Sequence, residues 1–288
     1  MQEVIRPGSS WVPNCRVSVV IPTLKEAENL KFVPPRIPQG VHEVILIDGH
    51  STDATHEVAK QLLSDIRIIM QTGRGKGNAL RTGFSAATGD VIVMLDADGS
   101  TDPLEIPAFV GILMSGFDFA KWSRFMHCCG TADMPLYQRS GNLAFVGTVR
   151  VLFGGRYSDL CYGYNAFWKS AIEQLELTRD VFEIEKMMNV RAPRAGLNVI
   201  EVPSSECRRV YGSSRLRTIP DGWRVLKTIA RERKFRPSGA RASDGVFAIQ
   251  SRNTWDADEP TVAHRPLISG GMDQFEVAKI SSVVSGDR

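Results

Sequence analysis

The chain has 288 residues, of which 43% are apolar, 8% aromatic and 23% charged. This is the composition of a globular protein, and it excludes a collagen-like chain, a fully disordered chain and a small disulfide-rich protein. The 35 basic and 32 acidic residues leave a net charge of only +3, so we expect no nucleic-acid partner.

The cysteines and the apolar runs indicate where in the cell the protein is located. The five cysteines show no C-x-x-C spacing, which is typical of reduced thiols. No apolar run approaches the roughly 18–20 residues of a membrane-spanning helix. The first 14 residues lack the apolar region of a signal peptide. We therefore expect a cytoplasmic protein that touches a membrane only from its surface.

Short runs of Val, Ile and Leu in the first half of the chain predict strands buried on both faces of a parallel sheet. They lie at residues 16–21, 43–47, 66–70 and 90–95. Helical patterns follow at residues 52–63, 76–87 and 104–115. Strand and helix alternate, which predicts an open α/β sheet. Ligands of such sheets bind beyond the carboxyl ends of the strands. We therefore expect one crevice at the segments 22–23, 48–49 and 96–98.

The second half of the chain is less regular. It contains predicted strands at 117–125 and 197–202, a helix at 182–195, an apolar segment at 139–153 and a basic run at 206–236. After residue 237 the sequence loses its periodicity, which is typical of a flexible tail. The expected organisation is an extension at 1–15, a single α/β domain at 16–237 and a disordered tail at 238–288.

Asp96 and Asp98 are the central candidates for chemistry. They follow a buried strand and are two residues apart, so they can share Mg²⁺ or Mn²⁺ and, through it, a diphosphate. Aspartyl phosphatases carry a similar D-x-D-G-S text, but nearer the chain start and with a downstream acidic pair. An EF-hand would require glycine where Thr101 stands.

For several other segments, the residue types alone allow more than one interpretation. The glycine-rich residues 73–78 form either a phosphate cradle or a tight turn before a helix. Arg124 either clamps a diphosphate or makes a surface ion pair. The acids at 180–185 are expected to cap a helix. The basic residues 208–215 bind phosphate or form a solvated loop.

The ordered series of these segments resembles glycosyltransferase family 2, which has the GT-A fold. It is closest to the dolichol-phosphate mannose synthase and polyprenyl-phosphate glycosyltransferase branch. The matching segments are residues 19–30, 44–55, 75–84, 96–98, 121–124, 159–167, 182–185 and 209–216. The resemblance covers about residues 16–217. It implies a Rossmann-like, mixed, mainly parallel sheet that is flanked by helices.

The resemblance also implies roles for individual residues. Asp96 and Asp98 would hold the metal, Mg²⁺ or Mn²⁺, with Asp98 as its direct ligand. The implied catalytic residues are Asp98, Arg124, Glu183 and Glu185. The implied nucleotide-sugar site is Pro22, Thr23, Glu26, Ile47, Asp48, Lys76, Asp96, Ala97, Asp98 and Arg124. The implied acceptor and phosphate site is Arg139, Arg209, Ser214 and Arg215.

The implied reaction is an inverting transfer from a nucleoside-diphosphate sugar to a polyprenyl phosphate at the membrane surface. A lipid phosphate is already ionised at pH 7 and needs cations rather than a base. A soluble hydroxyl acceptor would need a base, for which Glu183 and Glu185 are the candidates. A protein that only binds a nucleotide sugar is the third alternative, and the intact pair Asp96 and Asp98 argues against it.

Residues 220–235 predict an amphipathic helix. Arg224, Lys227, Arg231 and Lys234 fall on one face, and Trp223, Leu226, Ile229 and Ala230 supply apolar surface. Such a helix either lies in the headgroup region of an anionic membrane or packs its apolar side on the domain. The apolar segment at 143–153, which Arg139 and Arg156 flank, and the lipid acceptors of the resembled family favour the membrane.

Overall fold

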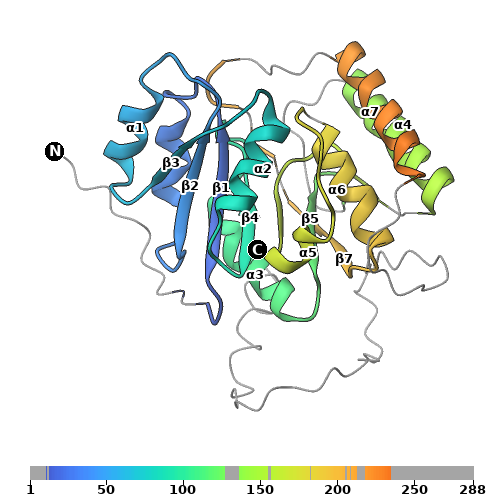
Figure 1. The fold of residues 1–288 in the computed structure, drawn as a ribbon, viewed down its shortest axis with the longest axis horizontal. Coiled ribbons are helices and arrows are strands. Elements are labelled where there is room, and N and C mark those ends of the chain that lie inside the picture. The colour runs from blue at the N-terminus through green and yellow to red at the C-terminus, as the bar shows by residue number, and fades with distance from the viewer. Residues whose placement is uncertain are drawn as a thin grey trace, which may run out of the picture. The chain divides into compact units, whose positions relative to one another are not determined.

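The computed structural model describes residues 11, 13–126, 136–154, 157–181, 183–204, 206–207, 209–212 and 218–234. The expected tail at 238–288 lies outside these residues. In the described part, seven strands form one sheet in the order β3-β2-β1-β4-β6-β5-β7 (Figure 1). The strands are β1 (Val17–Thr23), β2 (Glu43–Asp48), β3 (Arg67–Met70), β4 (Val91–Met94), β5 (Phe119–Ser123), β6 (Asn165–Trp168) and β7 (Val199–Pro203).

The strand directions confirm a mixed, mainly parallel sheet. β1, β2, β3 and β4 are parallel to their neighbours, and β5 is parallel to β7. β6 runs antiparallel to both β4 and β5, between which it lies. The predicted strands are confirmed, whereas β6 was not predicted. Its four residues, Asn-Ala-Phe-Trp, do not alternate between polar and apolar side chains and include no β-branched residue. These residues therefore carry no strand signal.

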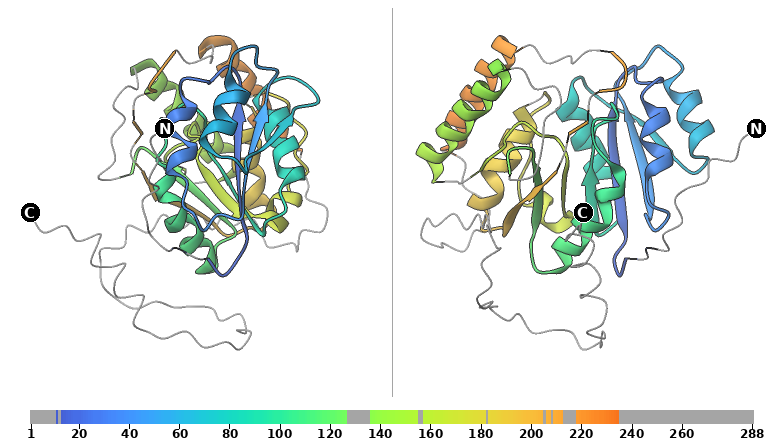
Figure 2. Two further views of the ribbon diagram at one scale, coloured as in Figure 1. Left: turned by 90° about the vertical axis from the view of Figure 1, so that its left-hand side faces the viewer. Right: turned by 180° about the vertical axis from the view of Figure 1, so that it is seen from behind.

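Helices cover both faces of the sheet. The α-helices are α1 (Thr55–Leu62), α2 (Lys76–Ala86), α3 (Ile106–Met114), α4 (Leu136–Phe153), α5 (Lys169–Glu173), α6 (Glu183–Arg194) and α7 (Thr218–Glu232). Short 3₁₀ turns are η1 (Leu30–Phe32), η2 (Pro34–Arg36) and η3 (Pro103–Glu105). α2 and α6 pack on one face of the sheet, while α1 and α3 pack on the other. The view from behind shows α3 in front of the strands (Figure 2).

α4 and α7 lie side by side at one end of the sheet, as Figures 1 and 2 both show. α7 buries Val225 and Ile229 in the core that also contains α6. Arg191 of α6 donates from Nε to Glu232 of α7 over 2.6 Å. The expectation that α7 offers Ile229 to a membrane is therefore wrong, because this side chain is fully buried.

Trp223 behaves differently, since it is 60% exposed and lies on the solvent side of α7. None of the helices in the described ranges is both long enough and apolar enough to span a bilayer.

Candidate functional site

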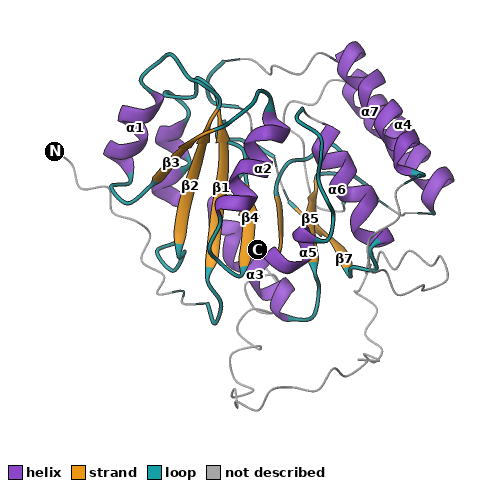
Figure 3. Ribbon diagram, viewed as in Figure 1, coloured by secondary structure: helices purple, strands orange, loops and turns teal. Residues whose placement is uncertain are grey.

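A cavity of about 290 Å³ opens beyond the carboxyl ends of β1, β2 and β4. The loops that surround it leave the same edge of the sheet (Figure 3). Its lining residues are Pro22, Thr23, Leu24, Glu26, Gly49, Gln71, Gly75, Lys76, Ala79, Asp96, Ala97, Asp98 and Arg209. The predicted convergence of three distant segments on one crevice is confirmed.

Lys76 connects the two sides of this cavity. Its Nζ lies 2.5 Å from Oδ1 of Asp96 and 2.7 Å from Oε1 of Glu185. Lys186 binds the other oxygen of Glu185 over 3.1 Å. Burial would raise the pKa of Glu185, but the two lysines outweigh burial and lower it to about 2. Glu185 is therefore an ionised partner of Lys76 rather than the helix-capping acid that its position suggests.

Two glycines at the start of α2, Gly75 and Gly77, make this contact possible. A Cβ at Gly75 would lie 2.4 Å from the carbonyl oxygen of Asp180, and one at Gly77 would lie 2.5 Å from that of Arg179. Asn78 N also donates to Asp180 O over 3.0 Å. The turn is thus packed against the segment that leads into α6, which brings Glu185 to Lys76. The close backbone approach that its glycines allow is to this segment of the chain.

Asp98 is held differently from Asp96. Its Oδ1 accepts hydrogen bonds from the backbone N and the Oγ of Ser100, over 3.0 and 2.7 Å. Its Oδ2 lies 3.3 Å from Nη2 of Arg209. Arg209 also donates from Nη1 to the two carboxylate oxygens of Glu26, over 3.2 and 3.3 Å. A cation thus already lies between Asp98 and Glu26 across the cavity.

The donor set of the cavity suits a hard divalent cation. The described residues contain no cluster of three or more His, Cys, Asp or Glu that could bind a metal by themselves. Mg²⁺ is commonly held by only one or two carboxylates together with substrate phosphates and water. Asp98, with one oxygen facing only an arginine, and the adjacent Asp96 provide such a pair of carboxylates.

Asp48 lies directly behind the cavity wall and is completely buried. Its Oδ2 accepts from the backbone N of Ser51 over 2.9 Å and lies 3.2 Å from Nε2 of His56. Its Oδ1 is buried with no hydrogen-bond partner among the described residues. A buried acceptor without a partner is costly, so a donor from a ligand would satisfy it. Ile47, by contrast, lies in the hydrophobic core and does not line the cavity.

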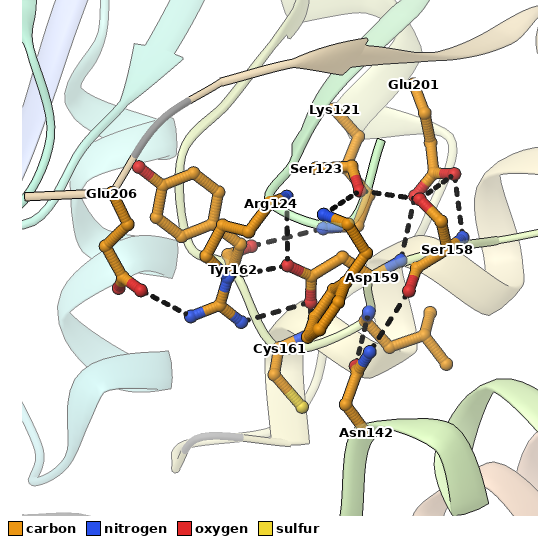
Figure 4. Close-up of polar contacts among 12 residues, drawn as sticks. Lys121, Ser123, Arg124, Asn142, Ser158, Asp159, Cys161, Tyr162, Glu201 and Glu206 are labelled. Atoms are coloured by element: carbon orange, nitrogen blue, oxygen red, sulfur yellow. Dashed lines mark hydrogen bonds and ion pairs between the residues drawn. The ribbon is translucent and has the colours of Figure 1, made fainter. Parts of the chain in front are cut away.

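Arg124 is not among the cavity-lining residues, and it is not the surface ion pair that was the alternative. It is buried, and its Nε and Nη2 donate to the two oxygens of Asp159 over 2.7 and 3.1 Å (Figure 4). Its Nη1 donates to Glu206 over 2.9 Å. Its guanidinium also lies 4.8 Å from the ring centre of Tyr162. Burial would raise the pKa of Asp159, but Arg124 lowers it and keeps this carboxylate charged.

Glu201 of β7 holds the turn that carries Asp159, the partner of this arginine. It accepts hydrogen bonds from the backbone N atoms of Ser158 and Asp159, over 2.8 and 3.2 Å (Figure 4). Lys121 is fully buried nearby and donates to the carbonyl oxygen of Tyr162 over 3.2 Å. The network fixes the turn that carries Asp159, so the direction of the Arg124 fork is set by the protein itself.

The other predicted site residues are scattered. Glu183 is half-buried at the start of α6, and Arg139 is exposed on α4. Ser214 and Arg215 lie outside the described residues. Gln71 was missed, although it follows β3 at the same sheet edge and its position could have been inferred from the strand-end rule. Glu206 was also missed, because it stands at the start of a basic run.

Comparisons with known proteins identify the family of this chain. The profile described as glycosyl transferase family 2 matches residues 18–176, more than half of the chain. A dolichol-phosphate mannosyltransferase of Pyrococcus furiosus is 32% identical over 211 residues, covering 70% of this chain and 59% of that protein. A dolichyl-phosphate hexose transferase of Haloferax volcanii is 29% identical over 219 residues, covering 75% of this chain and 92% of that protein.

Solved structures share the fold. Glucosyl-3-phosphoglycerate synthase of Mycobacterium tuberculosis, in complex with Mn²⁺, UDP and phosphoglyceric acid, superposes with a TM-score of 0.59 at 20% identity. The match covers 78% of this chain and 81% of that one. The expected GT-A fold is confirmed, and with the profile match over residues 18–176 the chain belongs to glycosyltransferase family 2.

Proposed function

We propose that this protein transfers a sugar from a nucleoside-diphosphate sugar to a polyprenyl phosphate of the dolichyl type, with inversion at the anomeric carbon. The observation that carries the proposal is the cavity at the strand ends. It places the carboxylates of Asp96 and Asp98 beside the cations Lys76 and Arg209. The names of the two archaeal relatives support a polyprenyl phosphate as the acceptor.

Asp98, assisted by Asp96, would hold Mg²⁺ or Mn²⁺. A divalent cation in this place supplies charge neutralisation for the departing nucleoside diphosphate. The chain itself adds two cations, Arg209 and Lys76, which both line the cavity. Developing negative charge is best stabilised by groups that are already oriented, and Lys76 is oriented by two carboxylates.

The nucleoside would lie over β1 and β2, at Pro22, Thr23, Glu26 and Asp48. The unpartnered Oδ1 of Asp48 is suited to accept a hydrogen bond from a base N–H. Arg124 would bind phosphate at the acceptor side, together with Arg139, Arg209, Ser214 and Arg215. A phosphate acceptor also fits the state of Glu185, because a carboxylate with a pKa of about 2 and two lysine partners is a weak base.

The acceptor lipid places the reaction at a membrane surface, to which this protein would bind peripherally. α4 exposes Leu143 and Val151, which are 67% and 83% exposed, and α7, which packs against α4, exposes Trp223. Exposed apolar side chains among basic ones are typical of interfacial helices.

The test is incubation of the protein with a panel of nucleotide sugars, a polyprenyl phosphate and Mn²⁺, with the products identified by mass. We expect a polyprenyl phosphate-linked sugar, which is lost on adding excess chelator. Asp98→Ala should abolish the product and leave the thermal unfolding curve nearly unchanged, while the exposed control Asp65→Ala retains it. Transfer to a soluble hydroxyl acceptor alone, or full activity in chelator, would refute the proposal.

A further inference from the structure

A short segment after β7 contributes Arg209 to the lining of the cavity. We call it the strap, and it consists of Glu206, Cys207 and residues 209–212. It is fastened to the D-x-D loop, because Cys207 N donates to Ser100 O over 3.0 Å and Val210 N donates to Asp98 O over 3.4 Å. At its far end, Tyr211 and Asn29 exchange two hydrogen bonds, of 2.8 and 3.1 Å.

The two charged side chains of the strap each contact opposite charges of the site. Arg209, a cation, lies between the carboxylates of Asp98 and Glu26. Glu206, an anion, lies on the guanidinium of Arg124. The strap therefore provides a positive charge where the site presents carboxylates and a negative charge where the site presents an arginine.

Arg124 has three guanidinium nitrogens, of which only Nη1 is not bound by Asp159. Its Nε and Nη2 are fixed by Asp159, which is completely buried, while Nη1 is directed at Glu206 (Figure 4). The side chain of Glu206 is 25% exposed, so unlike Asp159 it can turn into solvent. Loss of Glu206 would leave Arg124 in place with one free, oriented nitrogen.

We propose that Glu206 occupies the position on Arg124 that the phosphate of the acceptor takes, so that the acceptor must displace this carboxylate in order to bind. The inference rests on the proposed function, since it assumes an acceptor phosphate. It makes Glu206 a specificity-determining residue. An ionised phosphate monoester replaces the carboxylate on the arginine, whereas an uncharged alcohol cannot.

The exchange is electrostatically reasonable. A phosphate monoester carries about −1.5 to −2 charge at pH 7 and has three acceptor oxygens, against one charge and two oxygens for a carboxylate. Because Nε and Nη2 are bound by Asp159, either group would pair with this arginine through Nη1, by a charge-assisted hydrogen bond. The Glu206 side chain can leave Arg124 while the backbone hydrogen bonds of the strap to Ser100 and Asp98 stay in place.

The test is a direct binding measurement, by titration calorimetry at pH 8 without nucleotide sugar. The probes are inorganic phosphate and farnesyl phosphate, with farnesol as the uncharged probe. Glu206→Gln, and independently Glu206→Ala, should bind both phosphates about tenfold more tightly than the unaltered protein, the effect of one charged hydrogen bond. Neither variant should bind farnesol more tightly. Unchanged or weaker phosphate binding by both variants would overturn the proposal.

Glu105→Gln is the matched control for general removal of negative charge. Glu105 accepts from Ser204 Oγ over 3.0 Å, so it lies next to the strap without touching Arg124. Burial raises its pKa to about 7, and at pH 8 it is largely ionised. It should not tighten phosphate binding, and an equal gain in this control would also overturn the proposal.

The outcome is separate from that of the transfer assay. If the phosphates bind more tightly to both Glu206 variants but no sugar is transferred, the displacement mechanism holds and the proposed function fails. If sugar is transferred but binding is unchanged, the proposed function holds and the displacement mechanism fails.

Discussion

The ammonium group of Lys76 lies 2.5 Å from Oδ1 of Asp96, while Oε1 of Glu185 approaches the same nitrogen to 2.7 Å. A Cβ at Gly163 would lie 3.0 Å from this nitrogen and 3.0 Å from Oδ2 of Asp96, so a larger residue there would crowd the pair. Lys76 thus pairs with Asp96, while Nη2 of Arg209 lies 3.3 Å from Oδ2 of Asp98, so each acid of the D-x-D motif has a cationic partner.

Replacement of Lys76 by methionine should destabilise the fold. The change removes a largely buried cation and leaves Asp96 and Glu185 facing each other as carboxylates. Breaking a buried ion pair by removing one partner costs about 3–5 kcal/mol. The measurement is the free energy of unfolding in urea at pH 7.

Adding Glu185→Gln to the Lys76→Met variant tests whether the lost stability comes from the carboxylates that Lys76 had neutralised. The double variant Lys76→Met with Glu185→Gln should recover part of the lost stability, since it removes one of the two carboxylates that had faced Lys76. A loss below about 1 kcal/mol for the single variant, typical of an exposed pair, would contradict the buried arrangement.

This site shows what local sequence patterns can and cannot predict. The runs of Val and Ile predicted β1 to β4, and the strand-end rule then placed Thr23 and Asp98 in one cavity. The contact between Lys76 and Glu185 depends on a turn that packs against residues 179–181, far away in the chain. No local pattern encodes such a contact. The acid at position 185 therefore carried only the signal of a helix start.

The same limit applies to Arg124. Its residue type and its place after a strand predicted an arginine at the site, but the positions of Asp159 and Glu206 follow from the order of strands in the sheet. β5 lies between β6 and β7, so the segments next to these strands meet at its end. The insertion of the antiparallel β6 was not predicted, and the anionic partners of Arg124 were missed with it.

Glu43 should make stability depend on pH in the acid range. Burial would raise its pKa, but hydrogen bonds from Ser18, Thr88 and Arg67 lower it to about 2. Since this pKa lies below that of the unfolded chain, Glu43 stabilises the fold above about pH 4.5. The contribution is lost as the pH falls from about 4.5 towards 2.

The variant Glu43→Gln isolates this effect. It should unfold more easily than the unaltered protein at pH 7, by about 1–2 kcal/mol after allowance for solvent screening. The difference between the two proteins should shrink steadily between pH 4.5 and 3, as thermal unfolding at several pH values would reveal. A difference that is constant over this range would show that the carboxylate charge of Glu43 is unimportant.

The buried pair of Arg191 and Glu232 defines where the chain can be shortened. Glu232 is near the end of α7 and accepts two hydrogen bonds from Arg191, so α7 is an integral part of the domain. A chain that ends at Pro237 should keep its thermal unfolding temperature and its nucleotide-sugar binding. A chain that ends before α7 should aggregate, because Arg191 and the core around α6 lose their cover. If the chain that ends at Pro237 is unfolded, residues 238–288 must contribute to the core.

The solvent side of α7 should bind anionic membranes. Arg224, Lys227 and Arg231 are exposed there, and the Lys227 nitrogen lies 5.5 Å from the ring centre of Trp223. Each basic residue near an anionic surface contributes about 1 kcal/mol, and the effect falls off within a Debye length. The three residues together can therefore hold the protein reversibly, with Trp223 in the headgroup region.

Co-sedimentation with vesicles that contain phosphatidylserine should show binding at low salt and release at high salt. The triple change of Arg224, Lys227 and Arg231 to glutamine should abolish this binding. The matched control changes Lys25, Lys31 and Lys60 to glutamine, which removes the same charge from exposed positions on other elements. Because the side of α7 that carries Val225 and Ile229 is already buried in the domain, only its solvent side can reach the lipid. Equal loss of binding in both triple variants would mean that overall charge, and not α7, attracts the protein to the membrane.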